Sequence, residues 1–404
     1  MIDRGRYNAP AEIDGLRLAA LGIGGLAFLV WAGGTYFNPE QGFRGWLLGM
    51  VFWGGIGIGS IGVLMLQYLT GGAWGIVIRR ICEAASRTLP LTFAAFLILA
   101  IFGVSSIYEW VHLPPDDYTV EHRGAFLTPL WWTVRGVAYF VILYVIVHLL
   151  NKWSLDQDKC DNYEDSAKLL STMSRFSGPT MVIYALVVTF AVVDWVMTLD
   201  PHWFSTIWGL LFVAGWALSC FCFSVIMLAY LSDKVPMNGI LGKRHFHDLG
   251  KLMLALVMVW AYFNFSQFLI IWSGNIPEET GWYLIRMKGA WGYIAWGLIL
   301  LHFAFPYLVL LQQDFKRRPK MLASIAAFIL VMRLVDMFFL IGPMPRVDHN
   351  AVPGAFVLTW LDFVGPLAIG GLWLAYFFRE LQKRPIVPVM DPFYPPAVEH
   401  GKGH

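Results

Sequence analysis

Ten stretches of this sequence are apolar over a length that can cross a lipid bilayer as a helix. One crossing needs about 20 apolar residues, because the hydrocarbon core is about 30 Å thick and a helix rises about 1.5 Å per residue. Of the 404 residues, 58% are hydrophobic and only 14% are charged, whereas soluble domains have about 25% charged residues. We expect an all-α integral membrane protein with spans near residues 16–37, 46–73, 89–110, 130–151, 178–199, 204–231, 248–272, 289–312, 321–342 and 354–378.

The basic residues are distributed unevenly between the two sides that these spans define. Two of the 29 Lys and Arg residues, Arg135 and Arg333, lie inside spans. Most of the others lie on the side of the N-terminus, and cytoplasmic loops carry the excess of Lys and Arg in membrane proteins. The pattern predicts an even number of spans with both termini in the cytoplasm. The exceptions, on the outer side, are Arg44, Arg123, Arg286, Lys288 and Arg346.

A polar and aromatic stretch joins the fifth and sixth spans, with the sequence DWVMTLDPHWFSTIWG at residues 194–209. Its turn is short, so the two flanking helices are expected to be antiparallel neighbours. Pro201 is favoured in the first turn of the second helix. Trp195, Trp203 and Trp208 suit an interfacial belt, where one part of each ring is in an apolar environment and another part meets water.

The second span contains the glycine-rich run GGIGIGSIG at residues 54–62. A glycine-rich nucleotide loop follows a strand and opens a soluble helix, and this run has neither neighbour. Glycines at close helical spacing allow two helices to approach closely in lipid. We interpret the run as a site of close helix packing.

Several ionisable residues lie inside the predicted spans, where a charge near the bilayer centre costs about 2.5–3.5 kcal/mol on insertion scales. Arg333 and Asp336 are three residues apart on the ninth span, so they share a helix face and can pair. Most of the other acids lie toward the outer ends of their spans. The set of candidates is Glu109, Arg135, Asp194, His302, Arg333, Asp336 and Asp362.

Two interpretations of this set are open. In one, the charges are paired statically and the acids at the outer ends only contact the wet interface. In the other, the acids together with His302, Tyr262 and intervening water form a proton-conducting half-channel to the outer face. The proton carriers would be Asp194, Asp336 and Asp362. Arg333 and Arg135 would tune the pKa values of these carboxyls by charge proximity, and His302 would connect them to the inner half.

The sequence offers no clear ligands for a metal or a haem. Its four cysteines form no C-x-x-C pair and no C-x-x-C-H sequence, so neither a disulfide framework nor a covalent haem is indicated. His302 and His148 are offset along their spans, whereas a b-type haem needs two histidines at compatible depth. No cluster has zinc-like spacing, and no long basic run indicates nucleic acid. We expect no cofactor bound by this chain.

We expect a single polytopic membrane domain over residues 1–404, which ends in a Pro-rich cytoplasmic tail at 380–404. The composition of this tail favours an extended segment along a neighbour, or disorder.

Two regions of the sequence resemble a known family. One is DWVMTLDPHWFSTIWG at 194–209, preceded by MSRFSGPTMVIYALVVTF at 173–190, and the other is FSQFLIIWSGNIPEETGWY at 265–283. With the ten-span pattern, they resemble the NrfD/polysulfide-reductase-C-like integral membrane subunits of bacterial alternative complex III. The resemblance extends over essentially the whole chain.

The resemblance implies two four-helix bundles, over residues 46–199 (spans two to five) and 204–342 (spans six to nine), flanked by the first and last spans. It implies an accessory subunit of a quinol:electron-acceptor oxidoreductase of respiratory or photosynthetic electron transport, in the bacterial cytoplasmic membrane. The implied partners are a paralogous NrfD-like subunit (ActC), extracytoplasmic subunits that hold haem c and iron–sulfur clusters, other small membrane subunits, and lipids. A subunit of this kind has no redox cofactor and is expected to contribute to proton translocation and assembly.

Three other functions compete with this hypothesis. The chain could be a purely structural subunit, since every buried charge could be statically paired. It could be a secondary transporter, but the inverted repeats and broken helices typical of that class are not evident. It could bind quinone itself, in a pocket formed by Tyr262, Trp260, Gln267 and Trp272.

Overall fold

The computed structural model describes residues 7–114, 116–124, 126–347 and 354–402, and the described chain is helical with no strand. Ten helical segments in it are long and apolar enough to cross a membrane, so the prediction of an all-α membrane protein with ten spans is confirmed. Eight of the spans consist mainly of one helix each, and these are α1 (Ile13–Phe37), α2 (Pro39–Thr70), α7 (Pro129–Lys159), α8 (Tyr163–Trp195), α9 (Trp208–Leu231), α10 (Lys243–Gly274), α15 (Pro319–Ile341) and α16 (Leu361–Gln382). The third span is composed of α3 (Ala73–Ser86), α4 (Leu89–Ile98), the π-helix η2 (Leu99–Gly103) and α5 (Val104–Ile107). The eighth span is composed of α12 (Gly289–Gly297), the π-helix η6 (Leu298–Ala304) and α13 (Phe305–Leu311).

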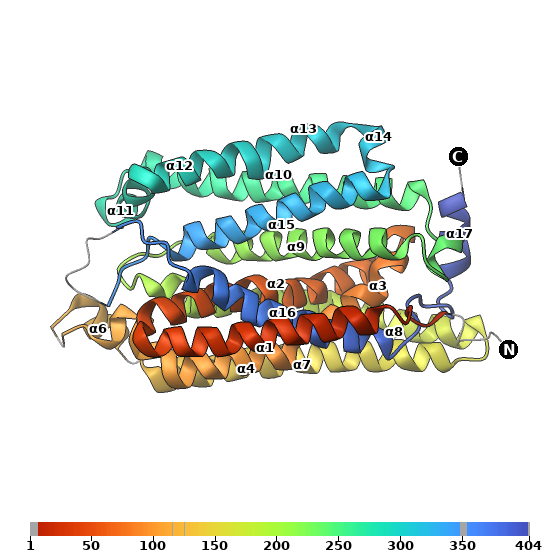
Figure 1. The fold of residues 1–404 in the computed structure, drawn as a ribbon, viewed down its shortest axis with the longest axis horizontal. Helices are drawn as coiled ribbons and strands as arrows, with labels where there is room; N and C mark the ends of the chain where they lie inside the picture. Colours follow the sequence, from red (N-terminus) through yellow and green to blue (C-terminus); the bar gives the residue numbers. More distant parts are fainter. Residues whose placement is uncertain (1–6, 115, 125, 348–353, 403–404) are drawn as a thin grey trace.

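The spans lie side by side along the long axis of the molecule (Figure 1). Tyr7 lies at the same end as the C-terminal segment, since its carbonyl accepts a hydrogen bond from Ile386 N (2.8 Å) and its ring packs edge-on against Tyr394. We call this end the basic end, because the sequence places most Lys and Arg residues there. Short helices cover the two ends, and these are η3 (Glu109–Val111), α6 (Tyr118–Arg123), η4 (Met197–Leu199), η5 (Met237–Gly239), α11 (Pro277–Arg286), α14 (Gln313–Lys316) and α17 (Tyr394–Lys402).

The helix α2 is the most buried of the ten spans and contacts α1, α3, α8, α9, α15 and α16. Its glycines allow these contacts. A Cβ atom at Gly59 would lie 2.4 Å from the carbonyl oxygen of Trp216 on α9, and one at Gly55 would lie 2.1 Å from the indole of the same residue. The glycine-rich run therefore packs helices closely, as the sequence indicated, and any larger side chain would force α2 and α9 apart.

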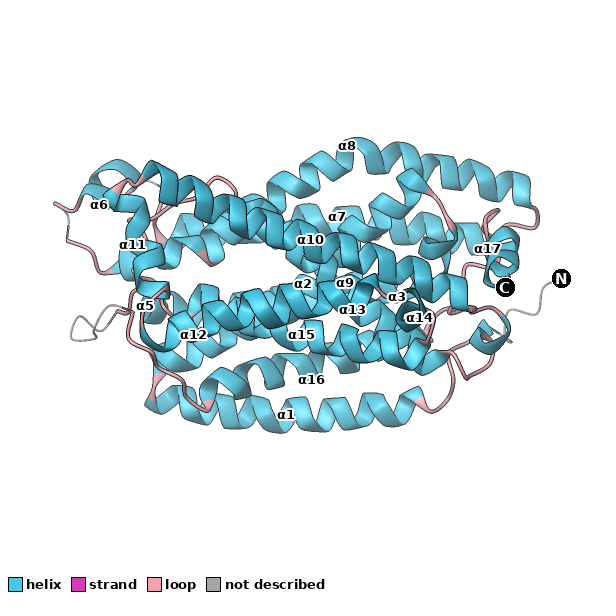
Figure 2. Ribbon diagram, turned by 90° about the horizontal axis from the view of Figure 1, so that it is seen from above, coloured by secondary structure: helices cyan, strands magenta, loops and turns pink. Residues whose placement is uncertain are grey.

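The other contacts follow the order of the chain. α2, the third span, α7 and α8 contact one another in turn, and α8 contacts α2. α9, α10, the eighth span and α15 do the same, and α15 contacts α9. The first and last spans, α1 and α16, pack against each other along one edge of the molecule and both contact α2 (Figure 2).

The stretch at residues 194–209 joins two neighbouring helices, α8 and α9, as predicted. Two details of the prediction are wrong. Pro201 is not in the first turn of the second helix, because α9 begins only at Trp208. Trp195, Trp203 and Trp208 do not form an interfacial belt, because all three rings are buried in the protein. Trp203 stacks on Trp282 of α11, with ring centroids 4.8 Å apart, so these rings pack the end of the bundle.

The C-terminal tail packs against its own chain, so the expectation of a disordered or neighbour-bound segment is wrong. Residues 386–391 are buried, and α17 contacts α3 and α10. Asp391 forms an ion pair with Arg79 of α3, and both side chains are fully buried. The apolar Ile386, Val387 and Val389 explain the burial of this segment, because they form part of the main hydrophobic core.

We predict that Gly59→Ala destabilises the protein by about 1–3 kcal/mol, since the new methyl group meets the backbone of α9, which cannot rotate away. Gly22→Ala on α1 is the matched control, because nothing lies within 4 Å of its added Cβ. Thermal unfolding in detergent measures both. Equal melting temperatures for the two variants would contradict the packing role of Gly59.

Candidate functional site

A buried charge pair on α15 is the centre of the candidate site. Asp336 forms an ion pair with Arg333, one turn earlier on the same helix, and accepts a hydrogen bond from Trp260 Nε1 of α10 at 3.0 Å. All three side chains are buried. Asp336 is about 7.5 Å along the helix axis from Ile341, the end of α15, and roughly 26 Å from its start, given a rise of 1.5 Å per residue. The pair therefore lies inside the membrane-spanning segment.

His302 lies beside this pair. It is on the π-helix η6 and is fully buried, with its ring centroid 4.0 Å from that of Trp260. Neither of its ring nitrogens has a hydrogen-bond partner among the described residues. Buried polar atoms are almost always hydrogen-bonded in folded proteins, and short π-helical segments occur often at functional sites. Among the described residues of the site, both ring nitrogens of His302 and the Nε of Arg333 are buried atoms whose bonding capacity the protein leaves unused.

The position of Arg333 depends on a glycine that sequence reasoning missed. Gly215 of α9 faces the guanidinium, and a Cβ atom there would lie 2.1 Å from Arg333 Nη2. Any larger residue would displace the charge. No motif marks Gly215 in the sequence, because its role appears only when α9 and α15 pack together.

Asp194, at the end of α8, is fully satisfied by its neighbours. Arg135 of α7 donates two hydrogen bonds to its carboxylate, each of 2.9 Å, and Tyr139 donates a third of 2.8 Å. The structure thus brings together Asp194 and Arg135 as the sequence hypothesis required. Glu109 lies in η3 at the same end of the molecule, next to Tyr108, whose hydroxyl donates to the carbonyl of Trp195.

Asp362 belongs to a separate group at the first turn of α16. Its carboxylate accepts hydrogen bonds of 2.6 and 2.7 Å from Gln41 of α2 and one of 2.8 Å from the backbone nitrogen of Thr359. A cavity of about 10 Å³ lies between Asp362, Gln41 and the end of α15, which is about the space that one water needs. No hydrogen bond within the described part of the chain joins Asp362 to Asp336.

The four residues considered for a quinone pocket do not converge. Tyr262 and Trp272 are 64% and 67% exposed, on the face of α10 that does not pack against the rest of the protein. Trp260 and Gln267 point inward, where Trp260 binds Asp336 and Gln267 connects Ser205 to Tyr283 by hydrogen bonds of 3.0 and 3.2 Å. Trp260 and Gln267 thus lie on the buried face of α10, and Tyr262 and Trp272 lie on its exposed face. The proposed four-residue pocket is therefore not formed.

Sequence reasoning also missed a buried charge network at the basic end. Arg79 and Arg80 lie between the expected second and third spans in the sequence, but the structure places both on α3, in which every residue from Gly75 to Ser86 is buried. Glu83 binds both arginines at 3.4 and 2.6 Å, and Asp158 of α7 binds Arg80 at 2.5 Å. The spacing of Arg79, Arg80 and Glu83 is the signal that could have indicated a helix here.

At the opposite end, two arginines bind the carbonyl groups that terminate α15. Arg44 donates to Ile341 O and Met344 O at 3.4 and 3.3 Å. Arg286 donates to Leu340 O and Phe339 O at 3.0 and 3.3 Å. Burial lowers the pKa of Arg286 to about 9, while burial raises the pKa of the nearby Asp200 carboxyl. Cations at a helix C-terminus also interact favourably with the helix dipole.

No model of a known protein family matches this sequence, and no curated protein matches it significantly.

We predict that Asp194→Ala destabilises the protein by about 3 kcal/mol, because it leaves Arg135 and Tyr139 without their partner. Asp165→Ala is the control, since that acid is on the same helix but exposed at the basic end. Thermal unfolding in detergent compares the two variants. If Asp194→Ala unfolds at the wild-type temperature, the ion pair does not stabilise the fold.

Proposed function

We propose that this chain is the ActF-like membrane subunit of an alternative complex III, a quinol:electron-acceptor oxidoreductase, and that Asp336 and His302 handle protons while partner subunits transfer electrons. The observation that carries the proton role is the buried group of Asp336, Arg333, Trp260 and His302. It holds an acid inside a membrane span next to a histidine whose two ring nitrogens have no hydrogen-bond partner among the residues that the structure describes. Ionisable residues at such a depth mark proton or ion pathways more often than not.

Two further observations support membership in this class of complex, and a third supports the orientation of the chain in the membrane. The motifs at residues 173–209 and 265–283 resemble the family over their whole length. The ten spans agree in number, and the two closed sets of helix contacts, α2 to α8 and α9 to α15, are those that a pair of four-helix bundles would make. The excess of Lys and Arg on one side supports an orientation with both termini in the cytoplasm.

In this proposal the ion pair acts as a charge-coupled proton site. When the Asp336 carboxylate takes up one proton it becomes neutral, and the Arg333 guanidinium is left as an unpaired positive charge. That charge favours release of the proton, which restores the ion pair. His302 can accept a proton on one ring nitrogen and donate from the other, so it is suited to exchange protons at this depth. Haem c and iron–sulfur clusters in partner subunits would supply the redox chemistry.

The geometry distinguishes among the acids that the sequence suggested as carriers. The carboxylates of Asp194 and Asp362 each accept three or more hydrogen bonds from fixed donors. Those contacts favour a static role, and they support the second candidate function, an assembly subunit with no proton path. A proton path requires that Asp336 take up and release a proton, whereas an assembly role requires only that it stay paired with Arg333.

The test uses the complex purified through a tag on this chain and reconstituted in liposomes. Quinol oxidation and proton movement are measured together for wild type and Asp336→Asn. We expect electron transfer to persist and proton movement to fall about a hundredfold, the lower range of what the loss of a positioned proton donor or acceptor costs. Failure of haem c and iron–sulfur subunits to copurify would refute membership in the complex.

A double variant, Arg333→Gln with Asp336→Asn, separates proton transfer from simple charge balance. This variant removes both charges. If Asp336 is needed only to balance the charge of Arg333, proton movement recovers in the double variant. If the double variant restores proton movement, or if Asp336→Asn never reduces it, the chain is an assembly subunit and the proton assignment is wrong.

A further inference from the structure

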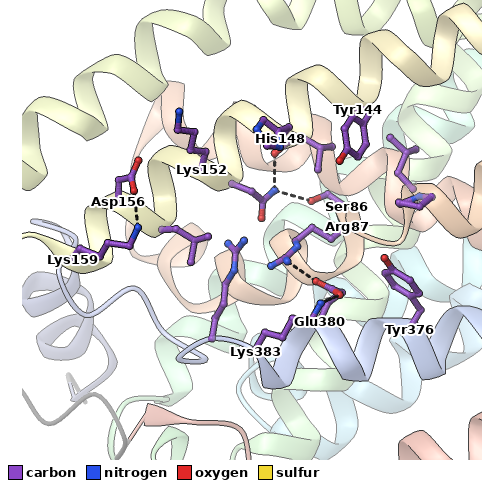
Figure 3. Close-up of a pocket in the computed structure, with 16 residues that line it drawn as sticks. Ser86, Arg87, Tyr144, His148, Lys152, Asp156, Lys159, Tyr376, Glu380 and Lys383 are labelled. Atoms are coloured by element: carbon purple, nitrogen blue, oxygen red, sulfur yellow. Dashed lines mark hydrogen bonds and ion pairs between the residues drawn. The ribbon is translucent and has the colours of Figure 1, made fainter.

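A cavity at the basic end of the molecule has the charge of an anion site. Its volume is about 490 Å³, within the range of about 300–1,000 Å³ typical of small-molecule sites. It lies where the junction of α3 and α4 meets α7 and α16 (Figure 3). Two carboxylates, Asp156 and Glu380, line it together with five cations, which are Arg87, Lys152, Lys159, Lys383 and Arg384.

The ion pairs within the cavity leave positive charge uncompensated. Glu380 is shared by Arg87, at 2.6 Å, and Lys383. Asp156 pairs with Lys159 at 2.9 Å, and Arg384 pairs at 3.1 Å with Glu83 of α3, an acid that Arg79 and Arg80 share. Lys152 forms no ion pair or side-chain hydrogen bond with any residue that the structure describes. An anion with several oxygens would complete the pairing, since phosphate oxygens accept charge-assisted hydrogen bonds from Lys and Arg.

The depth of the cavity matches the level of lipid headgroups. About 20 residues cross the hydrocarbon core. Counted from the opposite end, that length ends near Lys152 on α7, near Glu380 on α16 and near Arg87 at the start of α4. Three helices thus place the charged residues of the cavity at the same membrane surface.

The walls of the cavity are amphipathic. Leu89, Pro90 and Val147 line it on the membrane side of the cations. Tyr144 also lines it and is 52% exposed, and Figure 3 shows Tyr144 and Tyr376 on the same side, away from Lys159. Tyrosines are enriched at the boundary between hydrocarbon and headgroups. A ligand that follows these walls has a phosphate among the cations and an apolar part along the helices.

We propose that this cavity binds the phosphate headgroup of an anionic phospholipid from the surrounding bilayer. Basic pockets between spans on the cytoplasmic side recognise such headgroups. The inference depends on the ten spans and the cavity, not on the proposed role in quinol oxidation, and it stands or falls separately. A free phosphate ion has the same chemistry at the cations but would not use the apolar walls.

The test titrates the purified, detergent-solubilised protein with short-chain phosphatidylglycerol, short-chain phosphatidylcholine and inorganic phosphate, with the melting temperature as readout. A ligand that binds only the folded state raises this temperature with concentration. We expect phosphatidylglycerol alone to do so. Lys152→Gln is expected to weaken its apparent Kd about fivefold, the effect of one basic residue near a lipid surface, and Lys152→Arg to retain binding.

Lys320→Gln is the matched control, because Lys320 is also exposed at the basic end but does not line the cavity. Without lipid, all three variants should unfold at the wild-type temperature. The proposal is wrong if phosphatidylcholine stabilises as well as phosphatidylglycerol, or if Lys152→Gln and Lys320→Gln respond alike. A full shift produced by inorganic phosphate would overturn the lipid assignment and identify a site for a small anion.

Discussion

The contact between α2 and α9 holds the two halves of the chain together, and in it glycines of α2 meet both the backbone and the indole of Trp216. Within a membrane, burying one helix against another gains little from the hydrophobic effect, because lipid tails are as apolar as the side chains. Association depends on dispersion contacts, which weaken steeply with distance. The glycines of α2 bring Trp216 close enough for those contacts to be made, and α1, α3, α8, α15 and α16 all pack around this axis.

The arginines on the minority side of the membrane have a structural explanation. Arg44 and Arg286 are buried and bind the last carbonyls of α15 and the carbonyl of Met344 just beyond it. Arg346 donates to Gln41 and Arg123 to the carbonyl of Pro201. Each therefore stabilises a helix end or a turn. The exposed Lys and Arg residues at the basic end are of a different kind, because they belong to the excess of basic residues that marks the cytoplasmic side of membrane proteins.

The number of spans and the close packing of α2 could be predicted from the sequence because both depend on local composition. The pairing of Arg333 with Asp336 could also be predicted, since both residues are on one helix. The errors concern contacts between distant segments. Trp203 is of a residue type common at membrane interfaces, but Trp282 of α11 covers it. Gln267 and Tyr262 share a helix, but Gln267 is buried and Tyr262 is exposed. The partners Trp260 and His302 meet only through tertiary packing.

The ion pair between Arg79 and Asp391 joins residues 312 positions apart in the chain. Ribosomes deliver the N-terminal part of a chain first, so α3 is made long before its partner in the tail. Until then Glu83 is the only carboxylate that pairs with Arg79 among the described residues, with Tyr68 and Gln157 as neutral partners, and an uncompensated charge is costly to bury. The final burial of α3 is therefore a late step of assembly, completed only when the end of the chain has been synthesised.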